Sequence, residues 1–229
     1  MTNKDKYRLF CEKEKGINIF SQAWWLDSVA GETWDVCMVE KGNEVIATMP
    51  YVITKKYGFI SIGHPPLTQN LGPWLKQTGA KYSKVLSKQK GLMQALIEQL
   101  PDYTSFYQQW HYSQQNWLPF YWNGFEETTR YTYVIEDLSD LEHVWNDFQD
   151  NIKSDVRKAE KRFSLKVRTD LSIEDFIDLN EMTFSRQKID MPDSRNLIKK
   201  VIQKAHSRNQ CKWFIAQDDD GRNHAGVLI

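Results

Sequence analysis

Residues 151–163, NIKSDVRKAEKRF, carry five cations and two acids, although the whole chain has a formal net charge of zero. In a helix, like charges one turn apart repel each other by roughly 0.2–0.5 kcal/mol per pair, and a bound anion would offset that cost. Phosphate is the natural anion, because a guanidinium pairs with it through two hydrogen bonds. A solvated helix face is the plainer interpretation of any single cation. The predicted anion-binding residues are Arg157, Lys158 and Lys161, with Arg157 as the main one.

Two further groups of side chains have types that suit ligand binding. Trp24 and Trp25 cannot both face the core of one short helix, since neighbours are about 100° apart. We expect one of them in the core and the other beside a cleft, where it would stack on a ligand; two partly buried rings without a ligand are the alternative. The loop HPPLTQNLGPW offers His64, Gln69 and Trp74, because binding groups often lie on loops. A purely structural Pro/Trp loop is the alternative there.

Arg186 and Gln187 follow a predicted helix, from which they would reach an acceptor molecule. The alternative role of Arg186 is to complement the negative end of that helix. The five histidines never pair with each other or with cysteine at metal-ligand spacing, so we expect no metal site. Neither a G-x-S-x-G elbow nor a P-loop occurs. The sequence therefore names no catalytic base or nucleophile.

The composition restricts the class of protein. The chain has 229 residues, 41% of them hydrophobic, which is enough for a sizeable core. Thirty Lys and Arg balance thirty Asp and Glu, so no overall field attracts duplex DNA. Three widely spaced cysteines favour reduced thiols in a cytoplasmic protein. No apolar run is long enough to span a bilayer.

These groups must be positioned by two similar series of elements. In the first, a helix over 21–31 precedes a hairpin whose turn is Lys41-Gly42-Asn43. The remaining elements of this half are strands at 59–63, 103–111 and 128–138 and a helix carrying an apolar stripe over 86–100.

The second series begins with a capping-box signature at Ser139 and Glu142. It opens one long amphipathic helix, or two helices broken near residues 151–154. The elements expected after it are a strand at 164–168, a helix capped by Ser172 and Asp175, a helix around 197–205, and a hairpin over 211–229. Because Ile229 lies inside an apolar run, we expect the sequence to be the front part of a longer protein.

The order of elements from 164 to 229 resembles the opening half of a GNAT (acyl-CoA N-acyltransferase) domain. Residues 122–163 resemble the Fem family of peptidoglycan interpeptide-bridge aminoacyltransferases, whose chains pair two GNAT-like domains. The opening FSQAWWLDSVAG and the later MTFSRQ also resemble motifs of that family. The matching positions in 122–163 are Gly124-Phe125, Thr132, Asp137-Leu138 and the run from Val156 to Lys161.

The resemblance implies an α/β fold with two tandem GNAT-like domains, 1–137 and 138–229, the second incomplete, each with a mainly antiparallel mixed sheet flanked by helices. It also implies (amino)acyl transfer to an amine of a cell-wall or envelope precursor. The acyl donor would be acyl-CoA or aminoacyl-tRNA, with no tightly bound cofactor. A phosphorylated precursor, or a tRNA acceptor stem, would then face the cations of 151–163.

One part of the GNAT pattern is missing. In such domains the pyrophosphate of the donor sits on a Gly-rich turn at a helix N-terminus. The loop over 64–84 has no such run, and the sequence stops before the matching strand of its second half. We therefore expect an inactive fragment that lacks the donor loop and binds part of the acceptor. A non-catalytic module that binds sugar or an anion, or docks a partner, is the alternative function.

Overall fold

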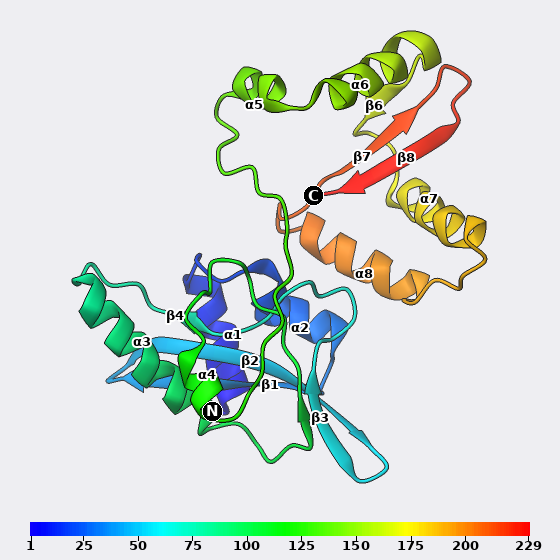
Figure 1. Ribbon diagram of the computed structural model, residues 1–229. Helices are drawn as coiled ribbons and strands as arrows, with labels where there is room; N and C mark the ends of the chain where they lie inside the picture. The colour runs from blue at the N-terminus through cyan, green and yellow to red at the C-terminus, as the bar shows by residue number, and fades with distance from the viewer. The chain divides into compact units, whose positions relative to one another are not determined.

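The computed structural model describes residues 1–229, which form two compact units, Met1–Glu127 and Thr128–Ile229 (Figure 1). Each unit contains a mainly antiparallel sheet flanked by helices, which confirms the predicted α/β fold class. None of the helices combines the length and the apolar character needed to cross a lipid bilayer. The two units are described separately below.

A long hairpin is the centre of the sheet in unit 1. Strands β1 (Trp34–Lys41) and β2 (Glu44–Lys56) pair antiparallel, which confirms the predicted hairpin. Gly42 in its turn has a φ of +63°, in the left-handed region that suits a residue without a Cβ. The other strands extend the hairpin: β3 (Phe59–Gly63) and β4 (Trp74–Leu75) pair antiparallel with β2, and β5 (Ser105–Phe106) pairs parallel with β3.

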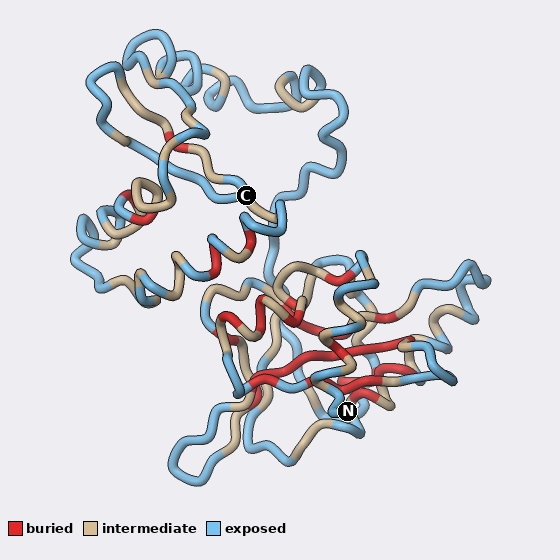
Figure 2. Tube along the Cα trace, turned by 180° about the vertical axis from the view of Figure 1, so that it is seen from behind, coloured by how far each residue is buried: buried red, intermediate tan, exposed pale blue.

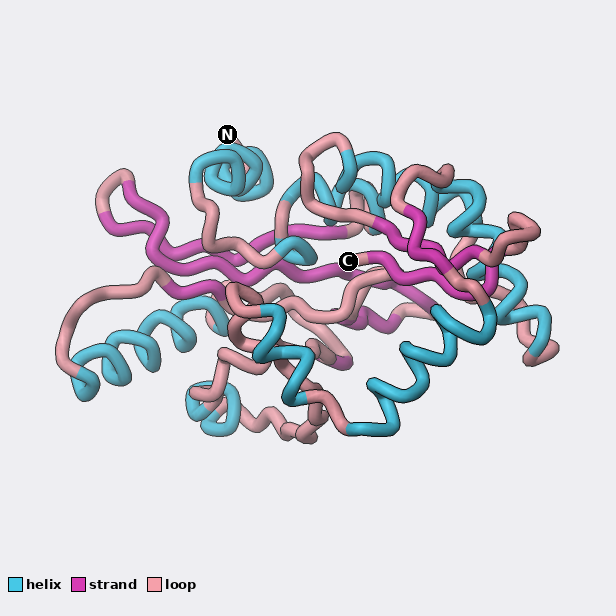
Figure 3. Tube along the Cα trace, turned by 90° about the horizontal axis from the view of Figure 1, so that it is seen from above, coloured by secondary structure: helices cyan, strands magenta, loops and turns pink.

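Helices lie on both sides of this sheet (Figure 3). Alternate side chains of a strand point to opposite faces. Trp34 packs with Leu26 in one buried cluster, and Met49 packs with Met93 in the other. Because both faces of the sheet are covered, the sequences of β1 and β2 are nearly continuous apolar runs. The helices of unit 1 are α1 (Asn3–Lys13), the 3₁₀ turn η1 (Ile19–Ser21), α2 (Ala23–Val29), α3 (Tyr82–Ile97) and α4 (Leu118–Trp122).

Two details of unit 1 differ from the sequence prediction. The helix predicted over 21–31 is shorter, because the 3₁₀ turn η1 includes Ser21 and α2 spans only Ala23–Val29. The strand expected over 103–111 is reduced to β5, followed by an isolated bridge between Leu71 and Trp110. Pairing with β3 continues only while the backbone runs parallel to it, so apolar composition alone overestimated the length of this strand.

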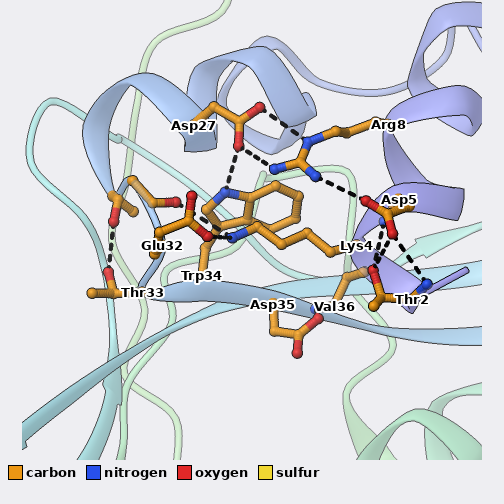
Figure 4. A network of polar contacts seen from close by, with 12 residues as sticks. Thr2, Lys4, Asp5, Arg8, Asp27, Glu32, Thr33, Trp34, Asp35 and Val36 are labelled. Atoms are coloured by element: carbon orange, nitrogen blue, oxygen red, sulfur yellow. Dashed lines mark hydrogen bonds and ion pairs between the residues drawn. The ribbon is translucent and has the colours of Figure 1, made fainter.

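Polar contacts surround the buried Trp34 at the junction of α1, α2 and β1 (Figure 4). Its indole Nε1 donates to Oδ1 of Asp27 at 3.0 Å, and the Arg8 guanidinium donates to both oxygens of the same carboxylate at 2.9 and 3.2 Å. The Lys4 ammonium lies 4.7 Å from the centroid of the indole ring. These contacts tie both helices to the edge strand of the sheet.

Unit 2 has a three-stranded antiparallel sheet in the order β6-β7-β8. Ile215 of β7 and Ile177 of α7 are both fully buried, and Val201 and Ile202 of α8 complete this small core. Figure 2 shows that the buried residues of this unit lie on α7, α8 and β7. The elements of this core are β6 (Lys166–Arg168), α7 (Ile173–Arg186), α8 (Arg195–His206), β7 (Trp213–Gln217) and β8 (Asn223–Leu228).

The basic segment is helical, as predicted, but it is a separate helix. Helix α5 (Leu141–Asp147) ends before Phe148, whose backbone is extended, and α6 (Asp150–Phe163) begins two residues later. The break therefore lies a few residues before the predicted one. Asp140 caps α5 by accepting the His143 N–H at 3.0 Å, so the predicted cap at Ser139 is wrong.

The strand predicted over residues 128–138 does not form. This segment has no ladder partner, and its Tyr131 and Tyr133 side chains are 94% and 103% exposed. Its alternating pattern has strand character, but a strand exists only where a neighbouring strand supplies hydrogen bonds. Residues 128–138 belong to neither sheet.

We predict that Asp27→Asn lowers the free energy of unfolding by about 1–2 kcal/mol at neutral pH. Burial raises the pKa of Asp27, but the hydrogen bonds from Arg8 and Trp34 outweigh it, so the pKa is lowered overall. A carboxyl group whose pKa is lowered by folding stabilises the fold at pH values above its unfolded pKa of about 3.9. This contribution to stability disappears as the pH falls through the pKa that the group has in the folded protein. Urea unfolding at several pH values measures both effects.

The matched control is Glu32→Gln, because Glu32 pairs with Lys4 of the same network but its side chain is 95% exposed. We expect a change close to zero for it. Equal losses of unfolding free energy in the two variants would contradict this account. So would a loss of unfolding free energy in Asp27→Asn that does not become smaller at acidic pH.

Candidate functional site

Four of the five cations of α6 are exposed, whereas Lys153 is partly buried, and the cations differ in what they contact. Lys153 donates to the Asn146 carbonyl at 2.7 Å, and Lys158 pairs with Asp155 at 3.3 Å. Arg157 and Lys161 form no ion pair. The guanidinium carbon of Arg157 lies 6.0 Å from the ring centroid of Trp145 in α5, a cation–π distance. Arg157 is therefore positioned by an aromatic ring and keeps its hydrogen-bond donors available.

The position of each cation along the helix separates a structural role from a binding role. Lys161 and Arg162 lie in the last turn of α6, where positive charge stabilises the negative end of the helix dipole. Arg157 lies in the middle of the helix and gains nothing from that end. It shares a face with Lys161, one turn or about 6 Å further along. The best-placed anion site in this helix consists of Arg157 with Lys161.

The apolar side of α6 borders an open groove of about 740 Å³ beside β6 and β7. Val156 and Ala159 of α6 line it together with Val167 of β6 and Ala216 of β7. Charged residues occur at its edge, where Lys166 pairs with Asp219 at 2.7 Å. The α6 helix thus presents cations on one face and an uncovered apolar groove on the other.

In unit 1, both ring nitrogens of His64 are engaged by the backbone. Nε2 accepts the Gln109 N–H at 2.6 Å, so the proton lies on Nδ1, which is 3.3 Å from the Thr68 carbonyl. Burial lowers the pKa of His64, against a smaller opposite effect of the hydrogen bond with Thr68. This geometry gives His64 a structural role in joining the loop 64–74 to residues 107–110.

The tryptophans divide as the helix geometry predicts. Trp25 is buried, with its Nε1 donating to the Thr68 hydroxyl at 3.0 Å, while Trp24 is half-buried and packs edge-on against it at 5.6 Å. Trp74 of β4 packs against Phe10 at 5.1 Å, and Gln69 is exposed at the surface of the loop. The predicted residues Trp24, Trp25, His64 and Gln69 therefore lie around one loop, and Trp74 belongs to the sheet.

Arg186 and Gln187 end α7 in unit 2, and both are exposed. Gln187 is the C-cap residue and bonds through its backbone, whereas the Arg186 side chain borders a groove between α7 and β8. His224 was not among the residues predicted from the sequence; it lines the same groove, with its Nε2 2.8 Å from Oδ2 of Asp218. The sequence feature that could have indicated His224 is the spacing of an acid and a histidine across a glycine turn, from Asp218 to His224.

Residues 1–229 contain no group of three or more His, Cys, Asp or Glu side chains placed to hold a metal ion. The thiols of Cys11 and Cys37 are removed from water, and burial raises their pKa to about 11 and about 12. They are therefore protonated and poor nucleophiles at neutral pH.

The fold is similar to that of a solved structure described as the crystal structure of FemX, with a TM-score of 0.59 and 13% sequence identity. The similarity covers 96% of this chain and 57% of the FemX chain, so this chain spans little more than half the length of that one. No protein-family model and no curated protein matches the sequence. At this identity the similarity shows a fold shared with FemX.

We predict that acid destabilises unit 1 through His64. Because the folded pKa lies below the unfolded value of about 6.5, the unfolded chain binds the proton more readily, and stability falls as the pH drops from that value towards the folded pKa. His64→Gln should be less stable at neutral pH but should lack this decline. His143→Gln, at an exposed site on α5, should retain it. Denaturant unfolding across this pH range, followed by tryptophan fluorescence, distinguishes these results; a decline that persists in His64→Gln contradicts the assignment.

Proposed function

We propose that this chain belongs to an N-acyltransferase of the Fem type, which transfers an aminoacyl or acyl group to an amine of a cell-wall or envelope precursor. The observation that carries the proposal is the similarity of fold to FemX over 96% of the chain. The motifs over residues 122–163 support it independently, because they were identified from the sequence alone. Aminoacyl-tRNA or acyl-CoA would be the acyl donor, and no tightly bound cofactor is required.

The proposed chemistry requires neither a nucleophilic side chain nor a metal ion. An amine attacks an activated acyl group directly once it is deprotonated, correctly oriented and close to the carbonyl carbon. Hydrogen-bond donors then stabilise the developing oxyanion. No covalent enzyme intermediate is needed. The contribution proposed for this chain is to hold the acceptor, with Arg157, Lys158 and Lys161 binding its phosphate groups.

Within that set, Arg157 is the proposed anchor. Its guanidinium is held against Trp145 and has no acidic partner, so phosphate binding breaks no existing ion pair. Lys161 adds a second charge on the same face, whereas Lys158 must leave Asp155, a weak exposed pair at 3.3 Å. A nucleotide-linked precursor carries two adjacent phosphate groups, and these match two cations one helical turn apart.

A non-catalytic docking module is the second candidate, and the surface of α6 favours it. Ile152, Val156 and Phe163 on its apolar face are 45%, 38% and 56% exposed. An apolar helix face of this kind is usually covered by another surface. This module would bind a partner or an anion without needing any acyl donor.

We predict that Arg157→Gln weakens binding of a nucleoside diphosphate-sugar to the protein by roughly tenfold, since it removes a charge-assisted contact. Arg162→Gln is the matched control, because it removes the same charge about 140° further round the same helix. Isothermal titration at two salt concentrations measures the affinities, and circular dichroism checks that α6 is retained. Equal effects of the two substitutions would show that the ligand is attracted by the positive charge of the helix in general and not bound specifically by Arg157.

The catalytic part of the proposal is tested by label transfer in the product of the entire gene that encodes this sequence. Radiolabelled aminoacyl-tRNA or acyl-CoA should pass its label to an amine of an envelope precursor, and Arg157→Gln should slow the transfer at low precursor concentration. Absence of transfer from both donors, with precursor binding intact, would reject the enzyme and leave the docking module.

A further inference from the structure

The groove between α7 and β8 has the features of a second ligand site, separate from the cations of α6. Its volume is about 220 Å³, enough for a small organic molecule. Helix α7 lies alongside β8 within unit 2 (Figure 1). The side chains that matter for the argument are Phe176, Leu179 and Arg186 of α7 and His224 of β8, with Gly226 at the wall.

Gly226 lets β8 approach α7 closely at one end of the groove. A Cβ at this position would lie 3.1 Å from Cδ2 of Phe176 and 3.3 Å from Cδ1 of Leu179, closer than most Cβ contacts in proteins. The absence of a side chain lets the strand approach the helix and leaves an apolar surface formed by these two residues. This end of the groove suits an apolar group.

The charged part of the groove contains a histidine that is held in place by a carboxylate. The register of β8 shifts so that Gln217 faces Asn223 and Ala216 faces Ala225, which leaves His224 as the extra residue of a β-bulge. Bulges redirect side chains and occur often beside functional sites. His224 Nε2 lies 2.8 Å from Oδ2 of Asp218, and no protein group contacts its Nδ1.

Asp218 is itself fixed before any ligand binds. Its Oδ1 accepts the backbone N–H groups of Asp220 and Arg222 at 3.0 and 2.8 Å, and its side chain is only 14% exposed. The hydrogen bond with His224 and that from the Arg222 backbone lower the pKa of Asp218, so it remains charged. A charged carboxylate fixed in this way orients the imidazole.

Arg186 supplies an uncompensated positive charge beside this pair. Three of the four acids of α7 pair with α8: Asp178 and Glu181 contact Arg195, and Glu174 contacts Lys199. The fourth, Asp175, accepts hydrogen bonds from Ser172 at the start of the helix. Arg186 forms no ion pair and is free to bind an anion with its planar fork of donors. The groove therefore combines a free guanidinium, an oriented imidazole and an apolar end.

We propose that this groove binds a small organic anion, a carboxylate or a phosphate monoester that carries a short apolar group. Arg186 holds the anionic group, and His224 lies beside it in the orientation set by Asp218. The apolar group lies against the Phe176 and Leu179 side chains that line the groove beside Gly226. This site goes beyond the proposed acyl transfer and does not depend on it.

The test is titration of the 229-residue protein, followed by NMR of its backbone amides, with phenyl phosphate, inorganic phosphate, benzoate and acetate. We expect phenyl phosphate and benzoate to bind more tightly than the anions without a ring, with the shifted amides in α7 and β8. The comparison of phenyl phosphate with benzoate decides between a phosphate and a carboxylate ligand. Arg186→Gln should weaken binding by roughly tenfold or more, because it removes a charge-assisted contact.

Three further variants make the result specific. Lys212→Gln removes an exposed cation outside the groove and should change nothing. Gly226→Ala narrows the apolar end, so it should weaken phenyl phosphate but leave inorganic phosphate unchanged, with the melting temperature as the check on folding. Arg157→Gln on α6 should leave binding at this groove unchanged. A failure of the groove proposal can therefore be distinguished from a failure of the proposed function. Equal affinity for ions with and without a ring, or unchanged binding in Arg186→Gln, would overturn the proposal.

Discussion

The constraint on which unit 1 depends is that both faces of the β1–β2 hairpin must be covered. Each strand contributes alternate side chains to two cores, so the loss of either helical layer would expose half of the apolar residues of the hairpin. The buried Trp34 adds a polar requirement, since its indole N–H needs an acceptor inside the protein. Asp27 meets that requirement and is in turn neutralised by Arg8, which fixes α1 and α2 on the same edge.

In unit 2, the requirement that the apolar faces of the sheet be covered is met on only one side of the sheet. Its sheet is covered by α7 and α8, whereas α6 and the groove beside β6 keep apolar side chains at the surface. The charged residues of this unit are distributed accordingly: acids of α7 are paired with α8, while Arg157 on α6 and Arg186 at the end of α7 are not. Both proposed anion sites depend on cations that the packing of the unit leaves without acidic partners.

Much of the fold was predictable because the local signals agreed with the packing. The hairpin turn at Gly42 and the cap formed by Ser172 and Asp175 both appear as expected. The same kind of signal, Thr2 with Asp5, caps α1, which the sequence analysis overlooked. The prediction of a strand over 128–138 failed for a different reason: alternation describes which side chains would share a face, but it does not supply a hydrogen-bonding neighbour.

For the sites, the sequence by itself determined the residue types: the cations of 151–163, the adjacent tryptophans and the amphipathic pattern of each helix are local properties that survive in any fold. Tertiary structure decided which of those groups are free. It placed both nitrogens of His64 on backbone partners, buried Trp25, and set Arg157 against a ring instead of an acid. It also brought His224 to Asp218 through a strand bulge, a contact that spacing permits but only the pairing register enforces. The physical reason is that charge and polarity belong to a side chain, whereas its availability depends on which neighbours satisfy its hydrogen bonds.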